Sequence, residues 1–338
     1  MNKNVTINDV ASMAGVSITT VSRILNNKPD VAPETRRRVL NAIAQLDYIP
    51  HAQAKNLAAG KSRSLAVLYP SDSTGFSELE FEFFVGASTF TTKRGFLFNL
   101  FVNVMSENTL LNLYRSNQID GIILMEIHLN DSRVNALKEN GYPFVMIGHC
   151  EDDTGLSFID LDFEASMMLS VEYLYKLGHR QIGILNLAGR VREVGYGPAV
   201  RSVLGYERAC ALYNLTPMIY EAMSTIEDAY TVTQRMLDEH PQMTAVVSMH
   251  TDSSVGVVRA VQHRGLSIPQ DFSLISVVAD RIAQLITPPL TAISLPAYLM
   301  GERAAQMLIR MLQDNDFESE QELLKPHLVV RDSTGPAR

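Results

Sequence analysis

The stretch TINDVASMAGVSITTVSRIL, residues 6–25, decides the fold of the first part of the chain. Thr6, with Asp9 three positions later, has the form of a helix-capping pair, and Gly15 supplies a break after a short helix. Ser17 is placed to cap a second helix. The stretch therefore predicts two short helices joined by a tight turn.

The spacing of small and apolar residues indicates how these two helices pack. Ala11 is small enough to let the helices approach, Gly15 follows four positions later, and Val21 follows six positions after that. This is the spacing of a helix-turn-helix. The outer side of its second helix would lie in the major groove, where Arg23 can reach two guanine acceptors and Ile18 a thymine methyl. The side chains predicted to face DNA in this region are Thr6, Ser17, Ile18, Thr19, Thr20, Ser22, Arg23 and Asn26.

A third helix is indicated by Pro33 near its first turn. Its expected apolar face consists of Val39, Leu40, Ile43 and Leu46. The alternative to a DNA-binding head is a small three-helix bundle with solvated charges. Ile18 favours the first interpretation, because an isoleucine is a poor choice for an exposed face that has no partner.

Charge is distributed unevenly along the chain, although the net charge is −8. Residues 1–64 carry nine Lys or Arg and four Asp or Glu, so this segment is +5 and the remainder is −13. Such a split suits a head that binds phosphates and a body that does not.

Beyond residue 63 the pattern changes to alternating strand and helix signals, which is typical of parallel sheets with helical crossovers. The predicted strands are apolar runs rich in β-branched residues. They read SLAVLYPS, FLFNLFVNVM, IDGIILM, YPFVMIGH, LSFIDLD, RQIGILN, TAVVSMH and FSLISVVAD. About 275 residues suffice for two such lobes.

Composition predicts a cytoplasmic protein. No apolar run reaches the roughly 18 residues of a membrane helix, and the first residues lack the apolar stretch of a secretory signal. Cys150 and Cys210 are far apart and have no metal-ligand partner at short spacing. Neither a disulfide nor a metal is expected, and no cofactor is expected.

Three stretches resemble enzyme motifs, and each fails on closer reading. AAGKS at residues 58–62 ends like a phosphate-binding loop, but Lys55 stands where the first glycine belongs. Gly195 and Gly197 form a GxG without the third glycine of a dinucleotide site. His149 and Cys150 are adjacent on an extended segment and so point to opposite faces, which favours a buried, inert cysteine. No enzyme activity is expected.

The stretch from residue 6 to residue 62 resembles, along its whole length, the head and hinge of the lactose/galactose repressor (LacI/GalR) family of bacterial transcription regulators. The resemblance implies that Ile18, Thr19 and Arg23 read bases. It also implies that residues 51–59 form a hinge helix at the minor groove. In that hinge, Leu57 is the apolar lever, Ala54 packs beside it, and His51 is a further contact to DNA.

The resemblance continues through KLGHRQIGIL, GLSIPQDFSLIS and TPPLTAISLP, and implies a periplasmic-binding-protein-like body. The expected fold is an all-α helix-turn-helix head plus hinge helix, joined to a two-lobed α/β body with parallel sheets. The domains expected are a DNA-binding head at 1–50, a hinge helix and linker at 51–64, and an effector-binding and dimerisation domain at 65–338. Its N-lobe is expected at about 65–163 and 294–324, and its C-lobe at about 164–293 and 325–338.

Ligands of such sheets bind beyond the carboxyl ends of the strands, in the cleft between the lobes. The candidate effector-binding residues are Ser71, Asp72, Phe76, His149, Arg190, Arg192, Tyr196, Arg201, His250, Asp252 and Asp280. A sugar-like ligand would use carboxylates and Arg for its hydroxyls and, because the chain has no Trp, Phe or Tyr for its apolar face.

The chain departs from the family pattern at three ligand positions. His250, Thr251 and Asp252 stand where the family has an Asn-Asp pair, and Asp280 is displaced from its usual place after FSLIS. Ser202 stands where the family has an Arg, although Arg201 is adjacent. Three explanations remain open: an unusual effector, loops shifted by one residue, or a cleft that no longer binds a sugar.

The function predicted is that of a homodimeric, sequence-specific regulator that binds double-stranded operator DNA at the nucleoid. It is expected to be a repressor of a catabolic operon, released or engaged by a small molecule, a sugar or sugar derivative, in the cleft. The alternative is an effector-independent regulator or activator of the same fold.

Overall fold

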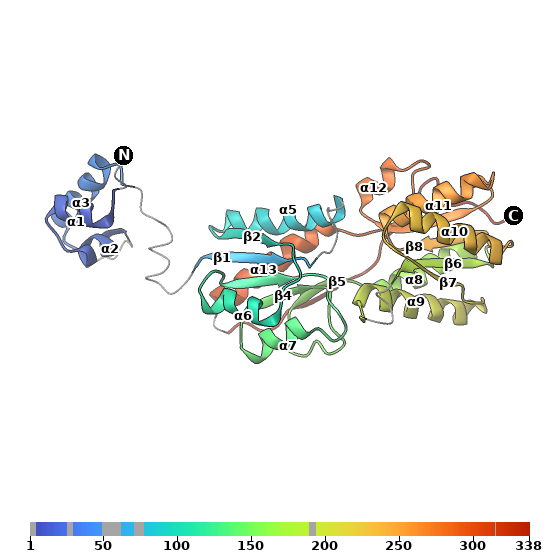
Figure 1. Cartoon of the computed structure of the whole chain (residues 1–338), viewed down its shortest axis with the longest axis horizontal. Coiled ribbons are helices and arrows are strands. Elements are labelled where there is room, and N and C mark those ends of the chain that lie inside the picture. The colour runs from blue at the N-terminus through green and yellow to red at the C-terminus, as the bar shows by residue number, and fades with distance from the viewer. Residues whose placement is uncertain (1–4, 26–29, 49–61, 71–77, 189–193, 315) are drawn as a thin grey trace. The chain divides into compact units, whose positions relative to one another are not determined.

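The computed structural model describes residues 5–25, 30–48, 62–70, 78–188, 194–314 and 316–338 (Figure 1). Contacts group the chain into two units. Residues 1–63 belong with 113–120, and residues 64–112 belong with 121–338. The first unit contains the predicted helical head, and the second contains the α/β body.

The head begins with helices α1 (Ile7–Ala14) and α2 (Ile18–Leu25), as the sequence predicts. The backbone N–H of Thr6 donates to the Asp9 carboxylate at 2.8 Å, which caps α1. Gly15 ends α1 with φ at 65°, a left-handed conformation that glycine adopts without steric cost. The Thr20 N–H then donates to the Ser17 hydroxyl at 3.1 Å and starts α2.

Helix α3 (Pro33–Gln45) closes a small apolar core with α1 and α2. Val10, Val21 and Val39 are fully buried in this core. The prediction was wrong for Leu40, which is 50% exposed, because Val39 and Ala42 set the buried face of α3 and Leu40 turns away from it. Three short helices therefore share one core, with each helix contributing one face.

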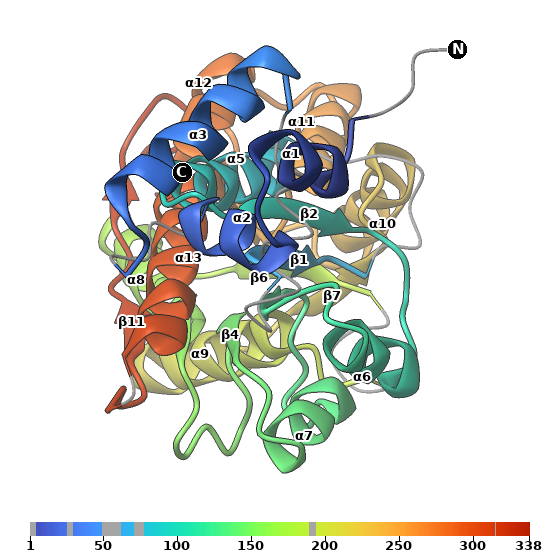
Figure 2. The ribbon, with the colours of Figure 1, turned by 90° about the vertical axis from the view of Figure 1, so that its left-hand side faces the viewer.

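The N-lobe of the body is defined here by a six-stranded sheet in the order β11-β5-β4-β3-β1-β2. The strands are β1 (Ser64–Leu68), β2 (Leu97–Phe101), β3 (Gly121–Leu124), β4 (Phe144–Ile147), β5 (Phe158–Leu161) and β11 (Gln321–Leu324), all parallel. Helices α5 (Glu78–Lys93) and α13 (Ala297–Gln313) lie side by side on one face of the sheet, and α7 (Ser132–Glu139) lies on the other (Figure 2). Helix α6 spans Glu107–Arg115.

The C-lobe is defined by a second six-stranded sheet in the order β12-β10-β9-β8-β6-β7. Its strands are β6 (Ile182–Leu187), β7 (Ile219–Ala222), β8 (Ala245–Ser248), β9 (Ser273–Val278), β10 (Thr291–Ser294) and β12 (Leu328–Val329), of which β12 is antiparallel. Its helices are α8 (Phe163–Lys176), α9 (Gly197–Tyr213), α10 (Ile226–Glu239), α11 (Thr251–His263) and α12 (Asp280–Leu285).

Alternating side chains of the C-lobe sheet pack into two different cores, as the pleat of a strand requires. Ile184 and Val247 pack with residues of α8 and α9. Val246 and Leu274 pack with residues of α10 and α11. The sheet is therefore covered on both faces, and the chain crosses between the two sheets after β5, after β10 and after β11.

All eight predicted strands are present in the structure. Seven of them are central parallel strands, which require apolar runs, and the eighth, β2, is an apolar run at a sheet edge. Four strands were not predicted. Of these, β7 reads IYEA and β11 reads QELL, and both lie at sheet edges. Three of the four residues of β7 are only partly buried, and none of the four residues of β11 is fully buried. An edge strand buries fewer side chains than a central strand and so does not need a continuous apolar run, which is the signal from which the central strands were predicted.

His179 is a buried residue that ties three segments of the C-lobe together; only 2% of it is exposed. Nε2 lies 3.0 Å from the carbonyl oxygen of Gly335, which can only accept, so Nε2 carries the hydrogen. Nδ1 then accepts from the Thr244 hydroxyl at 2.8 Å. Burial lowers the pKa of His179, the Gly335 carbonyl opposes this, and Arg180 adds to it.

This geometry predicts that the body loses stability on acidification. In the unfolded chain this histidine has a pKa of about 6.5 and binds a proton below that pH. In the folded protein the lowered pKa keeps His179 neutral, so the free energy of unfolding falls as the pH falls below about 6.5. The loss should approach about 1.4 kcal/mol per pH unit between pH 6.5 and the lowered folded pKa. Urea unfolding of wild type and His179→Gln from pH 7.5 to 5 measures it. The variant should be less stable at neutral pH but less dependent on pH, and equal slopes for both proteins would refute the assignment.

Candidate functional site

The outer face of α2 presents the side chains predicted to read DNA. Ile18, Thr19 and Arg23 are exposed, with Ile18 at 49%, whereas Val21 and Ile24 are buried in the head core. Successive residues of an α-helix turn by about 100° around its axis, so the three exposed side chains share the face opposite the buried pair. Packing of the head therefore fixes which side of α2 is available to a partner.

Three other predicted contact residues of the head, Thr6, Ser17 and Thr20, also take part in its helix caps. The hydroxyls of Ser17 and Thr20 lie 2.9 Å apart, and Thr20 and Ser22 are half-buried. The Thr6 hydroxyl donates to Asp9 at 2.7 Å. Thr6, Ser17 and Thr20 stand at helix N-termini, where backbone N–H groups favour an anion such as a DNA phosphate, whereas Ser22 lies in the middle of α2.

Arg23 forms an ion pair with Asp30, and the two side chains are 50% and 47% exposed. A pair this exposed contributes little to stability, on the order of 0–1 kcal/mol. Arg23 can therefore exchange Asp30 for a guanine or a phosphate at low cost.

Nine predicted site residues lie outside the described residues. In the head and hinge they are Asn26, His51, Ala54 and Leu57. In the body they are Ser71, Asp72, Phe76, Arg190 and Arg192.

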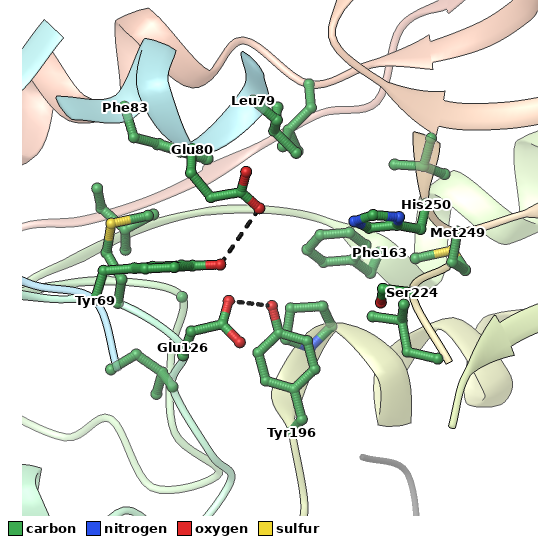
Figure 3. Close-up of a pocket in the computed structure, with 18 of the residues that line it drawn as sticks. Tyr69, Leu79, Glu80, Phe83, Glu126, Phe163, Tyr196, Ser224, Met249 and His250 are labelled. Carbon is green, nitrogen blue, oxygen red and sulfur yellow. Dashed lines mark hydrogen bonds between the residues drawn. The ribbon is translucent and has the colours of Figure 1, made fainter. Parts of the chain in front are cut away.

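A cavity of about 840 Å³ lies between the two lobes of the body, where the carboxyl ends of strands from both sheets meet (Figure 3). Tyr69 follows β1 and Glu126 follows β3 on the N-lobe side. Ser224 follows β7 and His250 follows β8 on the C-lobe side. This is where the topology of parallel sheets places a ligand.

Two tyrosine hydroxyls hold two glutamates at the wall of this cavity (Figure 3). The Tyr69 hydroxyl donates to Glu80 Oε1 at 3.3 Å, and the Tyr196 hydroxyl donates to Glu126 Oε1 at 3.0 Å. Glu126 has φ at 55°, a left-handed conformation that is strained for a side chain of this kind. Such strain is concentrated at functional sites, which supports a role for Glu126 in the cavity.

His250 and Asp252 enter the cavity at the start of α11. The Asp252 N–H donates to His250 Nδ1 at 3.3 Å, so His250 acts as the N-cap of the helix. Because Nδ1 accepts, Nε2 is the nitrogen that carries the hydrogen. Together with Tyr196, these are the predicted effector residues that the structure brings to the cavity wall.

Three other predicted effector residues do not line the cavity. His149 stacks on Phe158, and its Nδ1 lies 2.8 Å from Asp160 Oδ2. Asp160, and not His149, lines the cavity. Asp280 begins α12 and pairs with Arg331. Arg201 points to the backbone beyond β4.

The segment 195–201 of the C-lobe forms direct hydrogen bonds with the N-lobe, which we call the interlobe contact. The Leu129 N–H donates to the Gly195 carbonyl at 2.7 Å, and the Gly197 N–H donates to the Ile127 carbonyl at 3.1 Å. The Arg201 guanidinium donates to the carbonyls of His149 and Cys150 at 3.1 and 3.0 Å. Because Tyr196 lies within this segment, its bond to Glu126 belongs to the same contact.

Sequence reasoning missed several residues that line the cavity. Glu126 directly follows the predicted strand IDGIILM, so the strand-end rule applied to every strand could have found it. Tyr69 lies within the predicted run SLAVLYPS, but β1 ends at Leu68 and leaves Tyr69 at the strand end. Glu80 and Phe83 come from α5, whose first residues ELEFEFFV alternate acidic and apolar side chains and contain no ligand-binding motif. No signal in the sequence distinguishes those two.

Cys150 is buried, and burial raises the pKa of its thiol to about 11. The thiol therefore stays protonated at neutral pH, which agrees with the predicted inert cysteine. Within the described parts of the chain, no three His, Cys, Asp or Glu side chains are grouped to hold a metal ion. In the same residues, no helix is both long and apolar enough to cross a bilayer.

Residues 6–51 match the family described as bacterial regulatory proteins, lacI family, and residues 171–334 match a periplasmic binding protein-like domain. Among solved structures, the lac repressor dimer bound to operator and the anti-inducer ONPF is similar, with a TM-score of 0.84 and 25% identity. That similarity covers 98% of this chain and 100% of the other.

Two curated relatives match along nearly their whole length. The catabolite control protein A of Priestia megaterium is 30% identical over 98% of this chain and 99% of that protein. The HTH-type transcriptional regulator AglR of Rhizobium meliloti (strain 1021) is 32% identical over 98% of this chain and 95% of that protein. This chain, with its helix-turn-helix head and two-lobed body, belongs to the lacI family of bacterial transcription regulators, a family of DNA-binding proteins and not of enzymes.

Proposed function

We propose that the protein is a homodimeric repressor that binds operator DNA through its head and senses a small molecule in the cavity of its body. The observation that carries this proposal is the exposed face of α2, where Ile18 and Arg23 stand beside a buried helix-turn-helix core. The similar lac repressor structure is a dimer bound to operator. The protein would act in the cytoplasm, at the nucleoid, on a catabolic operon.

The proposed DNA contacts fall into two groups. Ile18, Thr19 and Arg23 would read base edges, and Thr6, Ser17 and Thr20 would meet phosphates at helix N-termini. Ser22 and Asn26 would be further contacts of the head with DNA. The predicted hinge residues His51, Ala54 and Leu57 would add the minor-groove contacts that the family resemblance implies.

The proposed effector contacts centre on the cavity wall. Tyr196, His250 and Asp252 line it among the predicted residues, and Glu80 and Glu126 are added by the structure. The remaining predicted residues of the body stay candidates: Ser71, Asp72, Phe76, His149, Arg190, Arg192, Arg201 and Asp280. A ligand at this wall would touch both lobes and could therefore change the angle between them.

Selection of bound sequences from a random duplex library tests the DNA-binding function. The full-length protein should enrich a near-palindromic site, because one head makes too few contacts for nanomolar binding and a two-fold dimer doubles them. Sedimentation with the selected site should give two chains per duplex. Failure to enrich any sequence, or one chain per duplex, would contradict the proposal. If the protein is instead an effector-independent regulator, it should still select an operator, but no small molecule should change its affinity for that operator.

Arg23→Ala should cost about 1–3 kcal/mol of operator affinity at one base position and relax the preference there. The reason is that an Arg side chain binds two acceptors of guanine, which no alanine can replace. Arg37→Ala is the matched control, since Arg37 is exposed on α3 outside the predicted contact set. Competition with single-base operator variants measures both. If Arg23→Ala keeps the wild-type base preference, Arg23 does not read DNA.

A further inference from the structure

We propose that Asp120 is a positioning residue for operator binding, because it fixes the place at which the linker leaves the N-lobe. This inference rests on the proposed function, in which the two heads of a dimer occupy one operator. Three consecutive residues, Ser62, Arg63 and Ser64, end the linker and begin β1, and we call them the linker anchor. Side chains from both neighbouring strands of β1 hold this anchor, Asp120 at the start of β3 and Asn99 in β2.

The Asp120 carboxylate binds Ser62 twice. Its Oδ1 accepts the backbone N–H of Ser62 at 2.7 Å and the hydroxyl of Ser62 at 3.0 Å. The two residues are 58 positions apart in the sequence, so this contact is not a local turn or cap. Hydrogen bonds to an ionised acceptor are about twice as strong as those between neutral groups. Within the described residues no other group donates to Asp120, so its carboxylate serves the linker anchor alone.

Asp120 itself is held firmly by the N-lobe. Ile119 before it is 3% exposed, and Ile122 after it is fully buried. Gly121 begins β3 and pairs with Leu65 of β1. Because the sheet fixes the backbone on both sides of Asp120, its carboxylate is a fixed point to which Ser62 is tied.

The start of β1 is tied from the opposite side as well. The Asn99 amide donates to the Ser64 hydroxyl at 2.6 Å and to the Leu65 carbonyl at 3.2 Å. Ser64 is only 5% exposed. The first residues of a strand fray easily when nothing restrains them. Here β2 and β3 each contribute one side chain that prevents fraying at the point where the linker enters the sheet.

The backbone between these two ties is bent in an unfavourable conformation. Arg63 has φ at 50°, in the left-handed region, which costs free energy for any residue with a Cβ. Such a conformation persists only where the surrounding structure holds it. The bond of Ser62 to Asp120 holds one side of the bend, and the bond of Ser64 to Asn99 holds the other. The bend at Arg63 therefore sets the direction in which the linker leaves the body.

Loss of this tie would lengthen the free connection between head and body. Without Asp120, Ser62 and Arg63 would join residues 49–61, which separate the described head from the anchor. An extended chain spans up to about 3.3–3.6 Å per residue, so each protomer would gain up to about 7 Å of reach. That is about two base pairs, at roughly 3.4 Å each. The two heads would then accept half-site separations that the wild-type dimer rejects.

Operators with altered spacing test this proposal on the full-length protein. The selected operator is compared with versions in which a single base pair is inserted or removed between the half-sites, which also turns one half-site by about a tenth of a helical turn. Fluorescence anisotropy measures each affinity. For wild type the altered spacing should lower affinity about ten-fold or more, and for Asp120→Ala about three-fold or less.

The ratio of affinities between spacings separates positioning from a loss of stability. A variant that is partly unfolded binds every operator less well by the same factor, so its ratio stays at the wild-type value. Asp120→Asn keeps an acceptor oxygen, although a neutral one, and should retain more of the spacing preference than Asp120→Ala.

Asp152→Ala is the matched control. Asp152 is exposed in the loop between β4 and β5 of the same lobe, where it accepts the Thr154 N–H at 3.1 Å, but it does not contact the linker anchor. Its spacing preference should equal that of wild type.

The outcomes distinguish this inference from the proposed function. Asp120 has no positioning role if Asp120→Ala keeps the wild-type ratio, if Asp120→Asn relaxes it more than Asp120→Ala, if Asp152→Ala relaxes it as much, or if wild type shows no spacing preference. In each of these cases a protein that still selects an operator as a dimer retains the proposed function. If no operator is selected, or one chain binds per duplex, the proposed function fails, and the inference fails with it.

Discussion

Gly301→Ala should destabilise the body severely, because the added methyl group has no space where α5 and α13 cross. A Cβ at Gly301 would lie 2.1 Å from the Phe83 carbonyl oxygen, and a Cβ at Gly86 would lie 2.1 Å from the Tyr298 carbonyl oxygen. Both obstacles are backbone atoms, which cannot rotate away as a side chain can. Overpacking typically costs about 1–3 kcal/mol, and we expect about 3 kcal/mol or more here.

Urea unfolding measures this loss, with Gly86→Ala as its counterpart on the other helix. Gly335→Ala is the matched control, since its Cβ would lie 3.4 Å from Pro269, which is ordinary contact. The control should stay within about 1 kcal/mol of wild type. If both Gly86→Ala and Gly301→Ala unfold at the wild-type urea midpoint, α5 and α13 can move apart without a loss in the free energy of unfolding, and the prediction is wrong.

This crossing also matters for the cavity, because α5 carries Glu80 and Phe83 to its wall. A glycine that allows two helix backbones to touch leaves little freedom for α5 to slide along α13. The packing of the N-lobe therefore helps fix the position of Glu80 relative to Tyr69.

The sequence predicted the fold well because the fold depends on local signals. The head is specified by Asp9, Gly15 and Ser17, each of which acts within a few residues of the chain. The central strands are specified by burial on both faces, which demands apolar runs. The edge strands β7 and β11 were not predicted, because most of their residues are only partly buried and their sequences contain no continuous apolar run.

The cavity was predicted only in part, because its wall combines positions that no local signal connects. The rule that ligands bind at strand ends led to Tyr196, His250 and Asp252. Asp280 does not line the cavity, since β9 continues to Val278 and Asp280 then starts α12, where it pairs with Arg331. Glu80 lies in the first turn of α5 and reaches the cavity because α5 packs against α13 and the sheet. These contacts join residues far apart in the sequence, so only the three-dimensional structure reveals them.

Arg201→Met should loosen the interlobe contact and shift the body toward an open arrangement of its lobes. Arg201 lies on α9 of the C-lobe, and both carbonyls to which it donates, those of His149 and Cys150, follow β4 of the N-lobe. Methionine keeps the length of the side chain and removes both donors. Hydrogen bonds from a charged group contribute about 1.5–3 kcal/mol each, so the loss of two should cost about 3 kcal/mol or more.

A change of about 3 kcal/mol corresponds to roughly a hundred-fold shift in the equilibrium between closed and open lobes. Fluorescence energy transfer between dyes on exposed positions of α7 and α10 measures the distance between the lobes. Arg208→Met is the matched control, because Arg208 lies on the same helix but pairs with Glu164 of the same lobe. Its distance distribution should equal that of wild type.

The interlobe contact connects the cavity to the rest of the body through Tyr196, which lies in the same segment as Arg201 and holds Glu126. A ligand that competes for Glu126 would act on the contact that Arg201 completes, so ligand affinity and lobe closure should change together in Arg201→Met. Burial lowers the pKa of the Arg201 guanidinium, while Asp160 and Glu164 oppose this shift, so these carboxylates help keep the charge in place. If Arg201→Met retains the wild-type distance between the lobes and the wild-type unfolding midpoint, the backbone bonds of residues 195–197 hold the lobes together by themselves, and Arg201 has no part in closing the cavity.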